Sequence, residues 1–518
     1  MENKTEGNKR IVKNTLYLYI RLVFVLVVSL YTSRVVLQTL GIVDYGIYNV
    51  VAGFVSMFAL LSTALTGATQ RFYNYEIGTN GEEGISKIFI SATYIQFIIV
   101  ALIILFAETV GLWYVANKMV YPLDREAAVH IVYQSSVIAL LFVVMQVPYS
   151  AAIVAHEKIN YYAIVGVIDV ILKLLIAVVV PHIGTDNLSI YGILITGVSI
   201  IDFAFYSVYA RKKFPQLRFK RVFYLNTFVE MLKFSGWSTL NTFSQVVKNQ
   251  GLNILMNLFF GPVVNAARGI SYQVKSALLG FVMNITTAAQ PQLTESYAMG
   301  NLEHSKKLMF SISKFIFFSL YIVALPIMYE VDLVLRLWLG NEIPEYAEVF
   351  TILVLVVSLV DILITPITMI ISASGKVGRF NFWYSFISIS VLPIAYIFLK
   401  IGYSPVSVYV ISLLLSVIME STSIIILKKE TGIGFLYYTQ QVLFPIFGVV
   451  LCTSLIPSLI VCNMTSCVVR LLVVFIVSLF FVAIAIYFIG LNKDERLMLH
   501  TYIKRILNKI KGDGRVGN

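Results

Sequence analysis

The chain has 518 residues, of which 58% are hydrophobic and only 13% are charged, and its formal net charge is +12. Soluble domains are roughly 45–50% apolar and about 25% charged. This composition excludes a water-soluble globular enzyme, because one aqueous core could not bury so much apolar surface. No polar stretch is long enough to hold a soluble catalytic domain.

The chain begins with a polar segment, residues 1–14, that carries four Lys and Arg residues. The apolar run that follows is long enough to cross a hydrocarbon layer about 30 Å thick. It lacks a small-residue cleavage pattern, so we expect a first span and not a removable signal peptide. With five further runs of this kind it forms a predicted N-lobe, residues 1–210. The six spans of the N-lobe are predicted near 15–37, 44–67, 88–109, 129–154, 163–183 and 190–210.

A basic linker, residues 211–235, separates the N-lobe from a predicted C-lobe, residues 236–427. An extra helix pair within 428–490 and a basic amphipathic tail, 491–518, complete the chain. The eight remaining spans are predicted near 236–260, 268–290, 308–331, 349–373, 384–401, 406–427, 439–461 and 468–490. The runs are continuously apolar and do not alternate, so helices are expected and not barrel strands. The predicted fold class is therefore an all-α membrane protein of about 14 transmembrane helices.

The distribution of positive charge predicts the orientation. With the N-terminus in the cytoplasm, 27 of the 39 Lys and Arg residues fall in cytoplasmic segments and 4 in outer loops. Cytoplasmic loops of membrane proteins carry this excess of positive charge. We therefore expect both termini in the cytoplasm. The basic segments should face anionic membrane lipids, and the net charge does not indicate a nucleic-acid partner.

The two predicted lobes share short sequence patterns. Gln70, Tyr75 and Gly78 match Gln292, Tyr297 and Gly300 at one offset of 222 residues, and Gly41 matches Gly261 at an offset of 220. Six predicted spans separate the copies, so both copies have the same orientation. This is a parallel repeat about an axis along the membrane normal, an architecture of transporters in which the substrate binds between the halves.

The segment Gly261-Pro262-Val263-Val264-Asn265-Ala266-Ala267-Arg268-Gly269-Ile270 carries a family resemblance, together with 290–293 and 297–301. These stretches resemble bacterial polysaccharide-biosynthesis (O-antigen) flippases of the multidrug/oligosaccharidyl-lipid/polysaccharide exporter superfamily. Arg34, Leu40-Gly41 and Tyr45-Gly46 fit the first-span region of that family. The resemblance implies a two-lobed transporter that moves undecaprenyl-diphosphate-linked oligosaccharide across the bacterial inner membrane. Partners would be the lipid-linked oligosaccharide and a polysaccharide polymerase or chain-length machinery, with no cofactor beyond Na⁺ or H⁺ coupling.

Other functions remain open. A multidrug exporter of the same superfamily is one alternative, and a flippase for the peptidoglycan lipid precursor is another. A membrane-embedded polymerase or ligase is the alternative from a different class, but the outer loops are short. We find no phosphate loop, His-Glu-x-x-His motif or nucleophile elbow in the sequence, so we expect a transporter and not an enzyme. Metal-ligand spacing is absent, and free thiols are favoured over a disulfide for Cys462 and Cys467.

The seventh predicted span carries amides every four residues and a lysine at mid-span. Spacing of four places these side chains on one helix face, and that face cannot be turned to lipid. The face should line a water-filled cavity, although hydrogen bonding between helices is the alternative. The residues are Asn241, Gln245, Lys248, Asn249, Asn253 and Asn257.

Charged residues within spans need a compensating role, because each costs about 2.5–3.5 kcal/mol at the membrane centre. Arg21, Lys248 and Lys275 are expected to hold the diphosphate, while Asn241, Gln245, Asn249 and Asn253 hold sugar hydroxyls. Arg34 and Arg268 are candidate gate residues, and Lys173 is expected to pair with Asp169 four residues earlier. Asp169, Asp202 and Asp361 are candidates for ion coupling. Arg34, Lys314 and Arg470 lie near span ends, where they can reach water.

Overall fold

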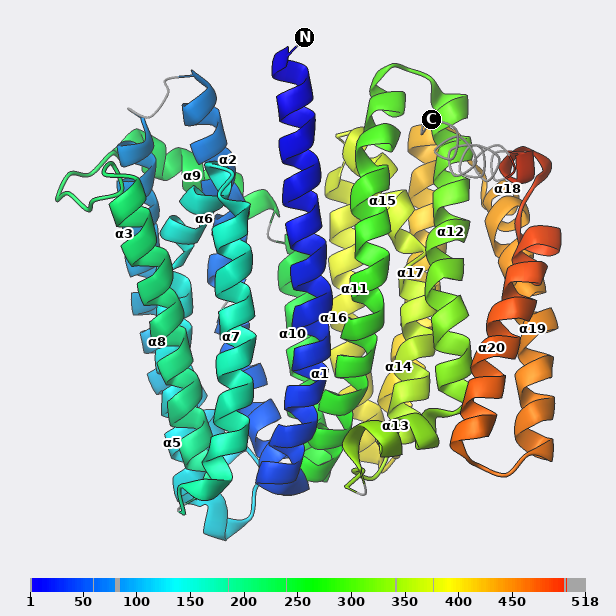
Figure 1. The fold of residues 1–518 in the computed structure, drawn as a ribbon, viewed down its shortest axis with the longest axis horizontal. Coiled ribbons are helices and arrows are strands. Elements are labelled where there is room, and N and C mark those ends of the chain that lie inside the picture. Colours follow the sequence, from blue (N-terminus) through cyan, green and yellow to red (C-terminus); the bar gives the residue numbers. More distant parts are fainter. Residues whose placement is uncertain are drawn as a thin grey trace, which may run out of the picture. The chain divides into compact units, whose positions relative to one another are not determined.

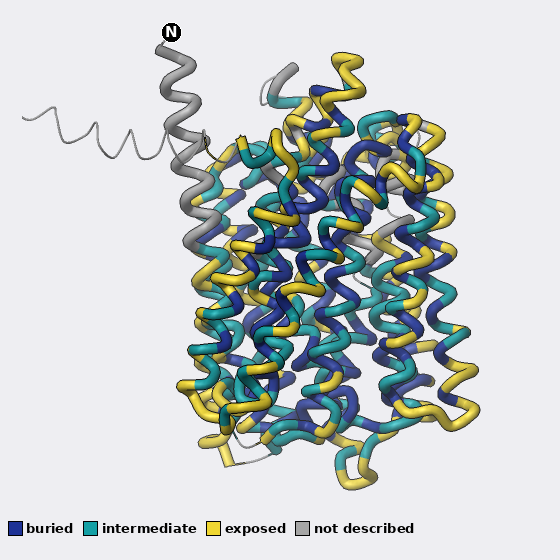
Figure 2. The backbone as a smooth tube through the Cα atoms, turned by 90° about the vertical axis from the view of Figure 1, so that its right-hand side faces the viewer, coloured by how far each residue is buried: buried dark blue, intermediate teal, exposed yellow. Residues whose placement is uncertain are grey.

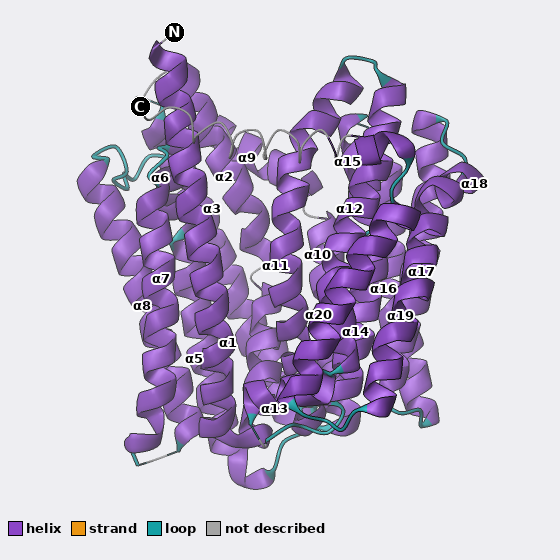
Figure 3. Cartoon of the chain, turned by 45° about the vertical axis from the view of Figure 1, so that its right-hand side comes forward, coloured by secondary structure: helices purple, strands orange, loops and turns teal. Residues whose placement is uncertain are grey.

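The computed structural model describes residues 2–58, 60–79, 84–184, 186–238, 240–340, 342–375, 377–497 and 500. Within these ranges the side chains of 2–20, 60–65, 67–68, 78–79, 234–238, 240–241, 281, 284, 287–288, 291, 298 and 430 are not described. Every regular element of the described chain is a helix (Figure 3). The predicted all-α class is confirmed.

The chain divides into two compact units. Unit 1 consists of Met1–Gln273, Trp338–Phe350 and Ser385–Val408. Unit 2 consists of Val274–Leu337, Thr351–Tyr384 and Tyr409–Asn518. The lobe boundaries expected from the sequence, with their linker at 211–235, stay a prediction.

Unit 1 is built from the first ten helices and from parts of later ones. Helices α1 and α7 lie side by side, as do α5 and α8 (Figure 1). The helices are α1 (Glu2–Phe58), α2 (Leu60–Thr79), α3 (Ile85–Phe106), α4 (Leu112–Asn117), α5 (Glu126–Met145), α6 (Val147–Ala155), α7 (Ile159–Val179), α8 (Asn187–Lys213), α9 (Leu225–Ser238), α10 (Leu240–Phe260), the start of α11 (Pro262–Ala298) and most of α16 (Val377–Ile401).

Unit 2 is built around α12, which contacts both helices of the extra C-terminal pair (Figure 1). Helices α13, α14 and α17 cross from one unit to the other along their length. The helices are α12 (Leu302–Tyr329), α13 (Val331–Leu339), α14 (Ala347–Asp361), α15 (Ile364–Ala373), α17 (Val406–Thr431), α18 (Phe435–Tyr438), α19 (Phe444–Asn463) and α20 (Val468–Ala485).

The described part of each predicted span is mostly helical. In the described chain, 11 helical segments are long and apolar enough to cross a membrane. Buried, intermediate and exposed residues follow one another along single helices (Figure 2). Large apolar side chains such as Phe447, Leu459 and Phe480 are exposed, as expected for helix faces that contact lipid.

Helices α4, α9, α13 and α18 lie wholly or largely outside the predicted spans, because they are short or not uniformly apolar. Helix α9 lies mostly in the segment predicted as a basic linker, and α13 lies between the predicted spans 308–331 and 349–373. Both mix apolar with polar residues, so neither reaches the length of apolar run that marks a span. Most of the predicted amphipathic tail, residues 498–499 and 501–518, lies outside the described residues.

A positive-φ glycine occupies the same place in each predicted repeat. Gly41 has φ 78° and interrupts α1 between the first two predicted spans. Gly261 has φ 75° and separates α10 from α11. Only glycine adopts this backbone conformation without steric cost, so the shared glycine has a structural reason in both copies.

The extra pair α19–α20 and the segment that follows it are joined to α12 by two ion pairs, and this corrects the expectation for two cations. Lys314 is 3% exposed, and its Nζ lies 2.5 Å from Glu495 Oε2. Arg470 Nε lies 2.7 Å from Glu330 Oε1. Neither cation extends to water as predicted from its position near a span end, because each has an acidic partner in unit 2. All three cysteines are free.

Candidate functional site

The polar face of α10 lies within unit 1 and has two parts. In one part the amides are buried and hydrogen-bonded to other segments, and in the other the side chains are partly exposed. At the C-terminal end, Asn257 is fully buried and its amide bonds both backbone groups of Val120, at 2.8 Å to N and 3.1 Å to O. One turn earlier, Asn253 donates to the Asn49 carbonyl at 3.1 Å. These bonds join α10 to other segments, which is the interhelical role left open by the sequence.

Asn253 also receives a bond from the start of α11. Asn265 Nδ2 lies 2.7 Å from Asn253 Oδ1 and 2.8 Å from the Asn253 carbonyl oxygen. Asn265 is fully buried. The Asn265 amide therefore fixes the turn at Gly261 and gives a structural reason for the asparagine in the segment that carries the family resemblance.

The other end of the face, toward the N-terminus of α10, is less enclosed. Gln245 donates to Ser388 Oγ of α16 at 3.4 Å, and Gln250 donates to Ser56 Oγ at 3.0 Å. Lys248 is partly exposed, and within the described chain it has no hydrogen-bonding or ion-pairing group. The Asn241 side chain lies outside the described residues. Among the described residues, Lys248 is thus a cation without a compensating group, in a helix that carries buried amides.

Arg268, a candidate gate residue, is enclosed and does not extend to water. It is 4% exposed, its Nη2 donates to the Asn249 carbonyl at 3.0 Å, and its guanidinium lies 4.2 Å from the centre of the Tyr272 ring. Arg34 on α1 is partly exposed. Their gating roles stay predictions.

Arg21 lies beside the predicted ion-coupling residues of α7 and α8. Its guanidinium is 4.8 Å from the centre of the Tyr162 ring, and a side chain at Gly166 would collide with it. Tyr206 lies within electrostatic reach of Arg21, Asp169 and Asp202. The α1–α7–α8 cluster, defined as Arg21, Tyr162, Asp169, Lys173, Asp202 and Tyr206, therefore combines a predicted substrate-binding cation with two predicted coupling acids.

The charges of the α1–α7–α8 cluster balance. Lys173 Nζ lies 2.7 Å from Asp169 Oδ1, which confirms the pair predicted from their spacing of four. Asp202 adjoins Asp169, and its buried Oδ1 has no hydrogen-bond partner in the described chain. The cluster contains two cations and two carboxylates, so an ion or proton that binds at Asp202 changes its formal net charge from zero.

In unit 2, Asp361 has an acidic neighbour that the sequence analysis did not single out. Ser416 Oγ donates to Asp361 Oδ1 at 2.6 Å, and one turn further along α17 lies Glu420. Glu420 is 5% exposed, and neither carboxylate oxygen has a hydrogen-bond partner within the described residues. The Tyr438 hydroxyl and the Asp361 carboxylate adjoin Glu420. The position of Glu420 in the middle of a predicted span indicates a special role for this acid. Its neighbour Asp361 lies on another helix, α14, so sequence spacing cannot identify the two as a pair.

A second group that the sequence did not indicate closes one end of unit 1. Arg125 bonds both carboxylate oxygens of Asp44, with Nε 2.9 Å from Oδ1, and its Nη2 lies 2.7 Å from Asp186 Oδ1. Asp186 also caps α8 through Ser189 N at 3.0 Å. Burial raises the pKa of Asp186, but the hydrogen bonds from Ser189 and Arg125 outweigh it and hold the pKa below its usual value. One guanidinium thereby joins α1, just after its break at Gly41, to the starts of α5 and α8.

The described residues contain no group of three or more His, Cys, Asp or Glu side chains that could hold a metal ion. Lys275 lies in unit 2 and is partly exposed, whereas Arg21 and Lys248 lie in unit 1. The convergence of these three cations on one diphosphate stays a prediction.

The fold can be compared with solved structures. Lipid II flippase MurJ, in its inward closed conformation, matches with a TM-score of 0.69 at 12% identity, over 92% of this chain and 98% of that chain. A MOP-superfamily transporter from Pyrococcus furiosus matches with a TM-score of 0.56 at 15% identity, over 81% of this chain and 96% of that one. A multidrug resistance MATE family transporter in its outward-facing conformation matches with a TM-score of 0.56 at 16% identity, over 81% and 96%.

The chain has the fold of MOP-superfamily transporters. It is accordingly an integral, multi-pass membrane protein. No family model matches the sequence, and no curated protein matches it. At these identities the likeness concerns the fold, and the substrate has to be argued from the site.

Proposed function

We propose that this protein is a flippase that moves an undecaprenyl-diphosphate-linked oligosaccharide across the bacterial inner membrane by alternating access. The observation that carries the proposal is the fold, matched over 92% of the chain by a lipid II flippase. The match to the MATE family transporter covers 81%. The match to the lipid II flippase therefore covers about 57 more of the 518 residues than the match to the MATE family transporter does. This number is close to the length of an extra helix pair, so a transporter with such a pair is favoured.

The substrate class follows from charge. A diphosphate requires cationic donors, and Lys supplies a point charge while Arg supplies a planar set of donors. Lys248 has no partner in the described chain, so it is available for an anion. Arg21 and Lys275 are proposed as the other two cations, and Asn241, Gln245 and Asn249 as hydrogen-bonding groups for sugar hydroxyls. Asn253 is left out of this set because both atoms of its amide bond other segments of unit 1. A cationic drug would be repelled by this arrangement.

A flippase for the peptidoglycan lipid precursor is the second candidate. The fold match to lipid II flippase MurJ favours it specifically. Its substrate shares the polyprenyl diphosphate and differs in the headgroup. The motifs around Asn265 and Arg268 resemble the polysaccharide flippases, and for that reason we place the oligosaccharide first.

We also propose that transport is coupled to Na⁺ or H⁺ through carboxylates within the spans. Asp202 and Glu420 each have buried carboxylate oxygens that no described group bonds. Asp169 and Asp361 adjoin them and would share the bound cation or proton. Acidic residues in such positions are commonly parts of ion or proton pathways.

The orientation with both termini in the cytoplasm is proposed from the positive charge of residues 1–14, 211–235 and 491–518. Anionic lipids would contact these segments. A polysaccharide polymerase or chain-length protein would receive the substrate on the outer side.

The substrate can be tested in proteoliposomes. Purified protein is reconstituted separately with undecaprenyl-diphosphate oligosaccharide, lipid II and the cationic dye ethidium, and appearance of each on the far side is followed with a membrane-impermeant reagent. Faster appearance of the oligosaccharide lipid than in protein-free vesicles is expected. Movement of lipid II alone would favour the second candidate, and movement of ethidium alone would contradict both.

A further inference from the structure

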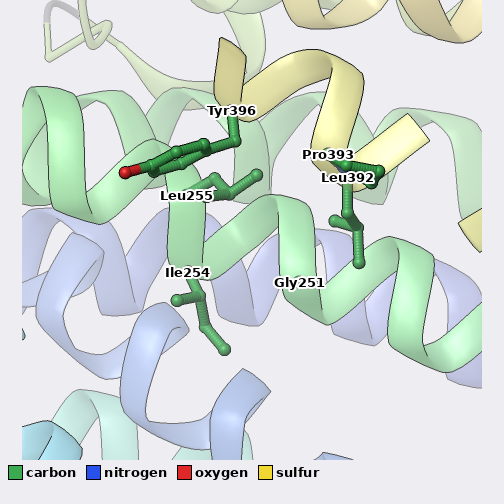
Figure 4. Close-up of a pocket in the computed structure, with 6 residues that line it drawn as sticks. All are labelled: Gly251, Ile254, Leu255, Leu392, Pro393 and Tyr396. Carbon is green, nitrogen blue, oxygen red and sulfur yellow. The ribbon is translucent and has the colours of Figure 1, made fainter. Parts of the chain in front are cut away.

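An apolar groove lies between α10 and α16 in unit 1 (Figure 4). Its volume is about 330 Å³, and it is open on one side. Small-molecule sites are roughly 300–1,000 Å³ and usually include a few polar groups. This groove is lined almost wholly by carbon, so it suits a segment of hydrocarbon chain. Its lining residues are Gly251, Ile254, Leu255, Leu392, Pro393 and Tyr396.

Two residues shape the contact between the helices beside the groove. Gly251 has no side chain, and a Cβ there would lie 2.7 Å from the Leu392 methyl groups. Pro393 lies inside α16, where it removes one backbone hydrogen bond and disturbs the helix. A larger residue at position 251 would therefore collide with Leu392 and displace this wall of the groove.

The two helices run in parallel, and their contacts establish the register. Gln245 bonds Ser388, a Cβ at Gly251 would meet Leu392, and the Phe259 ring lies 5.8 Å from the Tyr396 ring. Residue numbers on both helices therefore increase in the same direction along the groove. Gln245 and Ser388 therefore lie on the N-terminal side of the apolar walls, at similar levels of the two helices.

The groove becomes polar at that end. Lys248 lies three residues before Gly251 and seven before Leu255, which places it on the same helix face, about 4.5 Å and about 10.5 Å along the axis. On α16, Ser385 precedes Leu392 by seven residues, and its buried Oγ has no hydrogen-bond partner in the described chain. Gln245, Lys248, Ser385 and Ser388 thus form a polar end next to an apolar groove.

We propose that the α10–α16 groove holds the first isoprene units of the polyprenyl diphosphate substrate, with Lys248 at its phosphate. The inference rests on the proposed flippase function and assigns to the lipid tail a site that the function alone does not specify. Charge complementarity identifies the occupant, because a neutral chain would not need a cation, and Lys248 has no partner among the residues that the structure describes. In the predicted orientation the polar end of the groove faces the cytoplasm. A lipid of the cytoplasmic leaflet has its headgroup and tail in the same order, so it would fit the groove in this direction.

The test uses the full-length protein in vesicles of phosphatidylethanolamine and phosphatidylglycerol. Three probes with a diazirine near the first isoprene or acyl carbons are compared: undecaprenyl diphosphate, undecaprenol and phosphatidylglycerol. After irradiation, labelled peptides are identified by mass spectrometry. We expect undecaprenyl diphosphate to label peptides containing 251–255 and 392–396, and unlabelled undecaprenyl diphosphate to prevent the labelling.

Variants distinguish binding of the lipid tail from binding of the phosphate. Gly251→Leu should abolish labelling of both peptides, whereas the same change at Gly197 on α8, where a Cβ would meet nothing within 4 Å, should leave it intact. Leu255→Gln serves as a second groove variant if Gly251→Leu does not fold. Lys248→Gln should weaken labelling by undecaprenyl diphosphate about tenfold, the effect of losing one charge-assisted hydrogen bond, and should not change labelling by undecaprenol.

Two outcomes would overturn the proposal. One is equal labelling by phosphatidylglycerol that undecaprenyl diphosphate does not displace, which would make the groove a site for bulk lipid. The other is labelling elsewhere in protein that flips the substrate, which would leave the function intact and move the tail to another site. Specific labelling without any flipping would support the groove and contradict the flippase function.

Discussion

Arg470 and Glu330, 140 residues apart in the chain, form a two-point ion pair. Arg470 Nε lies 2.7 Å from Glu330 Oε1, and Arg470 Nη2 lies 2.8 Å from Oε2. Glu330 follows the last residue of α12, and Arg470 is in the first turn of α20. At the other end of the same helix pair, Lys314 bonds Glu495 and the Gly490 carbonyl. The extra pair is therefore attached to α12 at two separate levels.

Removal of one member of the Arg470–Glu330 pair should destabilise the protein strongly. Glu330 is 1% exposed, so Arg470→Ala leaves a buried carboxylate without its cation, at a cost of about 3–5 kcal/mol. Unfolding in mixed detergent, followed by intrinsic fluorescence, measures the loss. The exposed Arg336–Asp332 pair provides the matched control, because Arg336→Ala should cost no more than about 1 kcal/mol. Equal effects of the two changes would contradict this account.

Arg125→Ala should loosen the Asp44–Arg125–Asp186 group, and Arg125→Lys should restore it only in part because a lysine cannot bond three carboxylate oxygens in one plane. The pKa of Asp186 is lowered from 3.8 in the fold. Its contribution to stability is therefore present above that pH and is lost as pH falls below it. Thermal unfolding at pH 7 should show a lower midpoint for Arg125→Ala than for wild type. Equal midpoints would contradict the proposed role of Arg125.

Asn257→Leu should lower stability by about 1–3 kcal/mol, because the Val120 N–H and carbonyl groups lose their partner. Asn117 provides the same chemical change at a position where the amide is exposed and bonds its own helix, at 2.9 Å to the Trp113 carbonyl. Asn117→Leu should be nearly neutral in the same unfolding assay. If Asn257→Leu were equally stable but lost transport, Asn257 would belong to the substrate cavity instead.

Glu420→Gln should preserve the fold and remove one coupling group. The substitution keeps the size of the side chain and avoids a buried charge. We expect an imposed Na⁺ or H⁺ gradient to accelerate flipping by wild type and not by the variant, while the rates without a gradient stay equal. Glu303→Gln, at an exposed position on α12, should respond to the gradient as wild type does. A normal gradient response of Glu420→Gln would remove Glu420 from the coupling pathway.

The sequence predicts the spans well because each needs a long apolar run, which hydropathy detects directly. The predicted pairing of Asp169 with Lys173 is correct because both partners lie on one helix. Lys314 and Arg470 were misinterpreted because their partners, Glu495 and Glu330, are far away in the chain. The partner of Asn257 could not be predicted for a different reason. Asn257 bonds the backbone of Val120, and every residue type offers the same backbone groups.

The four-residue spacing predicts that the cation and the amides of α10 share one helix face. It does not predict which of them bond other segments of the protein and which remain available to a ligand. Asn253 and Asn257 are used to join segments of unit 1, whereas Lys248 has no partner in the described chain. Helical periodicity assigns all of these residues to one face and cannot distinguish the buried end from the exposed end. Tertiary packing makes that distinction.

The most direct test of the account is flipping of labelled undecaprenyl-diphosphate oligosaccharide in proteoliposomes by wild type, Lys248→Ala and Lys248→Arg. Lys213→Ala, at an exposed position in the last turn of α8, controls for loss of a positive charge elsewhere. The account predicts flipping by wild type and Lys213→Ala, loss in Lys248→Ala, and recovery in Lys248→Arg. Undiminished flipping by folded Lys248→Ala would contradict the claim that an uncompensated cation on α10 binds the diphosphate.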